Sequence, residues 1–146
     1  MNKTQKMFLF LTRISLGWMF FYAGITKVLN PAWSAEGYLK GAKTFSSFYL
    51  WLTQSALLSW TNLINEWGLT LLGISLILGI FVRLSSVLGT VLMLLYYLPI
   101  LDFPYPNPHA YIVDEHIIYI MLLLLLGSLR AGKAWGLDAK LEPNKK

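Results

Sequence analysis

The sequence contains no cysteine and few charged side chains. Without cysteine the chain has no disulfide, no thiol redox chemistry and no cysteine-ligated iron–sulfur cluster. Asp, Glu, Lys and Arg make up 13% of its 146 residues, whereas 56% are hydrophobic. The mean hydropathy is +0.56. A soluble domain is about one quarter charged, so this composition indicates an integral membrane protein.

Four apolar runs are each long enough, at roughly 20 residues, to cross a bilayer as a helix. We therefore predict an all-α membrane protein, a four-transmembrane-helix bundle formed by a single domain over residues 1–146. The predicted spans are residues 8–29, 63–82, 84–101 and 111–129. The net charge of +5 does not indicate a nucleic-acid partner, because the basic residues lie mostly at the ends of these runs, where they orient a membrane protein.

Residues 31–62 are the most aromatic part of the chain, and Ser, Thr, Gln and Lys are interleaved with the rings. Aromatic side chains mixed with polar groups favour the membrane–water interface. We predict an interfacial or re-entrant segment here. A fifth span over residues 45–60 is the alternative, but that stretch is short and polar.

The distribution of Lys and Arg predicts that both termini lie in the cytoplasm, with the protein in the cell membrane. In a four-span arrangement the side with both termini carries eight of the 12 basic residues. The other side carries Lys27, Lys40 and Lys43, and Arg13 lies within the first span. The positive-inside rule assigns the more basic side to the cytoplasm.

This topology brings ionisable residues that are distant in sequence to the outer side of the bundle. Ionisable residues at membrane depth are costly and usually functional. We expect Glu115 and His116 to face the bundle, with Glu66 and Lys27 as partners, while Asp114 favours the start of a helix. The candidate catalytic residues are Glu66, Glu115 and His116, and the candidate substrate-binding residues are Arg13, Lys27, Asp114 and Tyr119. A purely structural role for these ion pairs is the alternative.

The first span has one face of small and cationic residues. Glycines on such a face let a neighbouring helix approach closely. The face consists of Arg13, Gly17, Phe20, Gly24 and Lys27, at helical spacing.

No metal, haem or flavin site is predicted. Adjacent residues on a helix diverge by ~100°, so Asp114, Glu115 and His116 cannot all bind one ion. The Glu-x-x-His spacing of di-iron bundles is absent because residue 118 is Ile. His116 is the one histidine within a predicted span, which disfavours a haem with two histidine ligands.

The sequence resembles the DoxX/DoxD-like family of small four-helix membrane proteins, which includes the small subunit of thiosulfate:quinone oxidoreductase. The resemblance covers nearly the whole chain. It is carried by Arg13-Ile-Ser-Leu-Gly17 with Gly24-Ile-Thr-Lys27, by Pro31 to Gly41, by Glu66-Trp-Gly68 with Gly73, Gly79 and Arg83, by Asp114-Glu115-His116, and by Gly136-Leu137-Asp138. Gly136 stands where the family often has Ser.

The resemblance implies a membrane subunit that passes electrons from a small reductant such as thiosulfate to membrane quinone. It also implies a separately encoded partner subunit, because this chain has no visible redox centre. Carboxylates or a histidine near the surface could exchange the protons of quinone reduction. The alternatives are a membrane scaffold or lipid- or cargo-binding protein whose polar cluster is structural, and a small transporter, which would need a homodimer to surround a pathway.

Overall fold

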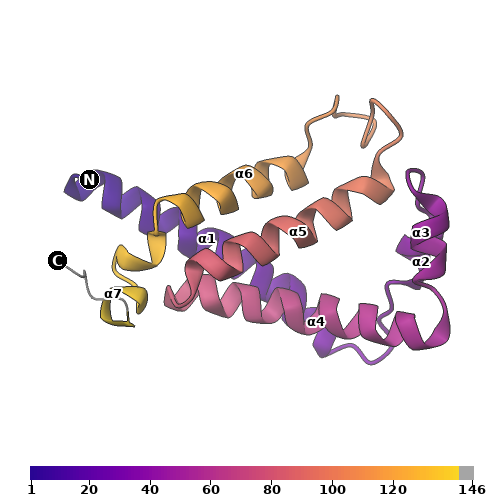
Figure 1. The fold of residues 1–146 in the computed structure, drawn as a ribbon, viewed down its shortest axis with the longest axis horizontal. Helices are drawn as coiled ribbons and strands as arrows, with labels where there is room; N and C mark the ends of the chain where they lie inside the picture. The colour runs from indigo at the N-terminus through magenta and orange to yellow at the C-terminus, as the bar shows by residue number, and fades with distance from the viewer. Residues whose placement is uncertain (142–146) are drawn as a thin grey trace.

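The computed structural model describes residues 1–141, and the regular secondary structure of that range is helical (Figure 1). Two isolated β-bridges lie in the loop between α5 and α6. The elements are α1 (Lys3–Val28), α2 (Glu36–Lys40), α3 (Ser46–Trp51), α4 (Ser55–Leu78), α5 (Val82–Ile100), α6 (Glu115–Ser128), the 3-10 helix η1 (Ala131–Lys133) and α7 (Asp138–Leu141).

Three of these helices, α1, α4 and α5, are long and apolar enough to cross a membrane. The chain is therefore an integral membrane protein, as its composition predicts. Helix α6 is apolar but has 14 residues, a length of about 21 Å that falls short of a hydrocarbon core of roughly 30 Å. By helix length, therefore, three helices of residues 1–141 can span the membrane and α6 alone cannot.

The predicted start of the last span, residue 111, is wrong. Helix α6 begins at Glu115 because Asp114 has extended backbone and its carboxylate accepts hydrogen bonds from the first-turn N–H groups of His116 and Ile117. Before this cap the backbone of Ile112 is left-handed, with φ of 59°. Tyr111 consequently lies outside α6.

The predicted start of the second span, residue 63, is also too late. Helix α4 begins at Ser55, so the aromatic segment between α1 and α4 is shorter than predicted and contains only the short helices α2 and α3. No separate helix covers residues 45–60, because α3 ends at Trp51 and a turn precedes α4. Figure 1 shows α2 and α3 at the end of the bundle where the α5–α6 loop also lies, and α7 beside the opposite end, where α1 begins.

The long helices pack as two close pairs, α1 with α4 and α5 with α6. Glycines permit the first pair. A Cβ at Gly24 would overlap the backbone N of Thr70, and one at Gly73 would overlap the backbone N and Cα of Phe21. The predicted close approach along the glycine face of the first span is confirmed.

The hydrophobic core runs between the two helix pairs. Its most completely buried side chains are Leu76, Val82, Leu123 and Leu126, on α4, α5 and α6. Leu9, Leu16 and Phe20 of α1 close the same cluster. A smaller cluster around Leu39 and Tyr49 packs α2 and α3 together.

Candidate functional site

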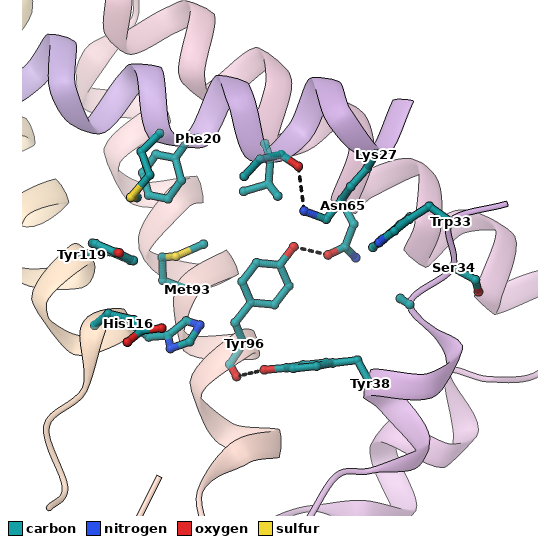
Figure 2. A pocket seen from close by; sticks show the side chains of 15 residues that line it. Phe20, Lys27, Trp33, Ser34, Tyr38, Asn65, Met93, Tyr96, His116 and Tyr119 are labelled. Carbon is teal, nitrogen blue, oxygen red and sulfur yellow. Dashed lines mark hydrogen bonds between the residues drawn. The ribbon is translucent and has the colours of Figure 1, made fainter. Parts of the chain in front are cut away.

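A cavity of about 390 Å³ lies among the four long helices and the segment that follows α1. Figure 2 shows side chains from α1, α2, α4, α5 and α6 converging on it. Its walls are mainly apolar and aromatic, with a few polar groups. The lining residues include Met19, Phe20, Lys27, Trp33, Tyr38, Asn65, Leu69, Met93, Tyr96, Glu115, His116 and Tyr119.

His116 enters the cavity from the first turn of α6, held by the residue that caps this helix. Asp114 Oδ2 lies 2.7 Å from His116 Nδ1. The same carboxylate accepts the backbone N–H of His116 through Oδ1, at 3.0 Å. The Asp114 side chain is 1% exposed and that of His116 is 18% exposed. A carboxylate on Nδ1 favours the tautomer with the proton there, which leaves Nε2 for a ligand.

The residues beside His116 form the aromatic wall of the cavity. The ring centroids of His116 and Tyr96 lie 6.2 Å apart and those of Phe20 and Tyr119 lie 6.0 Å apart, both edge to face. Glu115 also lines the cavity but is exposed. Glu115, His116 and Tyr119 thus line the cavity together, with Glu115 at its exposed rim.

A chain of hydrogen bonds crosses the cavity from α4 to α2. The Tyr96 hydroxyl donates to Asn65 Oδ1, and the Tyr38 hydroxyl donates to the carbonyl of Tyr96 (Figure 2). Asn65 Nδ2 donates to the carbonyl of Thr61 at 2.7 Å, which fixes the amide. Burial raises the pKa of Tyr38, so this phenol stays protonated as a donor. These hydrogen bonds connect α2 to the bundle.

Lys27 carries a cation to the rim of the cavity. Its Nζ donates to the carbonyl of Ala23 at 2.7 Å and lies 5.5 Å from the centre of the Trp33 ring. Within residues 1–141 no carboxylate lies within ion-pair distance of this ammonium. The expected partnership with Glu66 is therefore not formed, and the charge of Lys27 remains available to a ligand.

A known protein family matches the part of the chain that forms most of this cavity. The family model described as DoxX matches residues 8–100. The chain belongs to the DoxX family. No curated protein and no solved structure matches it. The family match covers Lys27, Trp33, Asn65 and Tyr96 but ends before α6, which supplies His116.

In this DoxX-family chain Glu66 lies outside the cavity. It is half-buried on the face of α4 that meets α1, where its carbonyl accepts the Thr70 hydroxyl at 2.7 Å. The preceding residue, Asn65, is the one that lines the cavity. One residue rotates a helix by ~100°, so Glu66 points past the cavity wall.

Arg13 also lies away from the cavity, in the N-terminal half of α1. Its side chain is fully buried, and its guanidinium donates to the carbonyls of Ala131, at 3.2 Å, and Trp135, at 3.5 Å. A Cβ on Gly79 or Gly136 would collide with this guanidinium. Arg13 thus fastens the segment after α6 to α1, and Gly136 provides the room that a Ser would fill.

Sequence reasoning missed four residues that shape the site: Trp33, Tyr38, Asn65 and Tyr96. A signal existed for Asn65, because an uncharged amide within an apolar helix needs partners when it is buried. In residues 1–141 no group of three or more His, Cys, Asp or Glu side chains is placed to hold a metal ion.

Proposed function

We propose that this protein is the membrane subunit of a quinone-linked oxidoreductase and that the cavity binds the quinone ring. The electrons come from a small reductant such as thiosulfate, directly or through a partner subunit. The observation that supports this proposal is an aromatic cavity, inside a bundle of membrane helices, into which Lys27 and the Asp114–His116 pair bring polar groups.

The cavity suits a flat, mostly apolar ring with an oxygen at each end. Its volume of about 390 Å³ falls within the range of roughly 300–1,000 Å³ for small-molecule sites. Phe20 and Tyr119 supply an apolar aromatic wall. Lys27 has no carboxylate partner within residues 1–141, so its charge would stabilise the negative oxygen that develops when a quinone accepts electrons.

Reduction of a quinone also requires two protons, and His116 is placed to donate one. With Asp114 hydrogen-bonded to Nδ1, Nε2 is the ring nitrogen left to pass a proton to a quinone oxygen. Glu115 is exposed at the rim of the cavity and would pass protons from water to His116. In this proposal Tyr119 packs on the quinone ring but transfers no proton. Glu66 and Arg13 do not contact the quinone.

The same proposal includes the membrane topology. Helix α6, with the residues on either side of it, makes the fourth crossing, both termini face the cytoplasm, and the cavity opens towards the outer side. Residues 31–54 then form an interfacial cover over the ring, joined to the bundle by hydrogen bonds from the Tyr38 hydroxyl to the Tyr96 carbonyl and from the Ala35 N–H to Asn62 Oδ1.

A second candidate is binding of an anionic lipid without redox chemistry. The observation in its favour is again Lys27, since an ammonium without a carboxylate partner within residues 1–141 suits a phosphate as well as a quinone oxygen. In that case the hydrogen-bonded histidine and the aromatic wall are structural.

The test is a quinone titration on the protein in lipid nanodiscs, with two alanine-to-phenylalanine variants. Ala23 lines the cavity, whereas Ala56 is exposed on α4 outside it. We expect Ala23→Phe to weaken quinone binding by more than about tenfold and Ala56→Phe to leave it unchanged. Equal binding by both variants, or an unsubstituted protein that binds anionic lipid and no quinone, would contradict the proposal.

A further inference from the structure

An apolar track leaves the cavity along the seam between α1 and α6. Two hollows of about 500 and 600 Å³ follow one another on this seam. Met19 lines both the cavity and the nearer hollow, and Phe8, Thr12 and Leu122 line both hollows. The shared lining residues place the three spaces next to one another in a row. We call the two hollows together the α1–α6 groove.

The groove follows from the way the helices pair. Helix α1 packs chiefly on α4 and α6 chiefly on α5, so the seam between α1 and α6 is incompletely filled. From Met19 to Phe8 it extends about 16 Å along α1, roughly half of the hydrocarbon core. Phe8 and Leu11 on its wall are exposed in the bundle and so face lipid.

A second groove of similar size, about 600 Å³, lies between α4 and α5. It is lined by residues such as Gly68, Ser75, Leu88 and Leu92. None of its lining residues also lines the cavity, so the two spaces share no wall side chain. Of these two apolar grooves in residues 1–141, the α1–α6 groove is the one that adjoins the cavity, at Met19.

We propose that the α1–α6 groove holds the isoprenoid tail of the quinone whose ring occupies the cavity. The inference rests on the proposed function and adds the class of substrate: long-tailed membrane quinones in preference to short-tailed ones. Its basis is the arrangement of the spaces, a polar-edged chamber with an apolar groove adjoining it at Met19. An amphiphile with a bulky head and a single flexible tail matches that shape, and burying the tail adds affinity in proportion to its apolar area.

The experiment compares a short-tailed quinone, whose tail ends inside the cavity, with a long-tailed one. Each is titrated into the full chain in nanodiscs at a fixed quinone-to-lipid ratio. Quenching of Trp33 reports occupancy of the cavity, with Trp33→Phe as the background for the other tryptophans. Ser15→Phe fills the α1–α6 groove from an exposed position. Gly68→Phe fills the rival groove, where a Cβ has its nearest neighbour at 3.8 Å.

We expect Ser15→Phe to weaken binding of the long-tailed quinone about tenfold and to leave the short-tailed quinone unaffected. Gly68→Phe leaves both affinities unchanged. The inference is overturned if Ser15→Phe does not discriminate between the tails, or if Gly68→Phe weakens the long-tailed quinone as much. If short-tailed quinone binds but tail length has no effect, the proposed function survives alone. If neither quinone binds the unsubstituted protein, both fail.

Discussion

Asp114 caps α6 and at the same time holds the imidazole of His116, with Oδ2 at 2.7 Å from Nδ1. The sequence suggests only the first of these roles. The first-turn N–H groups of α6 and the imidazole ring bind the same carboxylate. The position of the histidine in the cavity is therefore set by the start of its own helix. The two functions of Asp114 can be separated by substitution.

Asp114→Asn retains a good helix cap but removes the negative charge beside His116. We expect the rate of quinone reduction, measured with the reductant and any partner subunit present, to fall roughly ten- to a hundredfold. Positioned acid–base groups contribute about 10²–10⁴-fold to a rate, and Asp114→Asn weakens such a group without removing it. Thermal unfolding should change little. Asp114→Ala removes the cap as well and should lower stability by a further ~1 kcal/mol. Full turnover in Asp114→Asn would show that the pair is only structural.

Asn65 and Glu66 provide a neighbouring pair of tests. Asn65→Leu removes the acceptor of the Tyr96 hydroxyl, so we expect quinone affinity to fall about tenfold as the buried phenol loses its partner. Glu66→Gln should leave affinity and turnover close to those of the unsubstituted protein, because Glu66 does not line the cavity. A loss of turnover in Glu66→Gln with the fold intact would restore Glu66 as a proton donor.

Arg13→Met tests whether this buried cation is structural. It removes the hydrogen bonds to Ala131 and Trp135, so we expect the free energy of unfolding to fall by about 1–3 kcal/mol. The KM for quinone should not change, since Arg13 and Lys27 are ~21 Å apart along α1. Gly136→Ala should also destabilise, because its Cβ would meet the guanidinium. A raised KM in folded Arg13→Met contradicts the structural role.

Gly73 and Gly68 of α4 allow a matched measurement of helix packing. Gly73→Ala forces a methyl into the backbone of Phe21 on α1, and overpacking of this kind costs about 1–3 kcal/mol. Gly68→Ala meets only Ile64, at 3.8 Å, and should be neutral or stabilise by up to roughly 1 kcal/mol through helix propensity. Thermal unfolding in detergent checks the difference, and equal effects would refute the close approach of α1 and α4.

Much of the fold is predictable because apolar runs of membrane length and their glycine faces are local properties of the sequence. The ends of the helices are harder to predict from the sequence. Helix α4 continues to Ser55 through a stretch whose polar residues suggested an interface, and α6 starts late because the side chain of Asp114 replaces a backbone partner at that point.

The candidate site was predicted only in outline. Lys27, Glu115, His116 and Tyr119 share the cavity as expected. The sequence favours Glu66 as a site residue, whereas Asn65 lines the cavity. The rotation of α4 decides between them, and it is set by packing against α1 and not by the local sequence. The sequence does not reveal the contacts of Arg13 with carbonyl groups, because these carbonyls lie more than a hundred residues away along the chain.

We propose that the quinone ring lies between His116 and Lys27. The most direct measurement is cross-linking of a photoreactive quinone analogue to the protein in membranes, with the modified peptides identified by mass spectrometry and unmodified quinone as competitor. With the ring at this position, we expect labelling of residues 19–38 and 115–119 that unmodified quinone suppresses. Labelling confined to the outward faces of the helices, such as Leu88 or Met121, and insensitive to competitor, would contradict it.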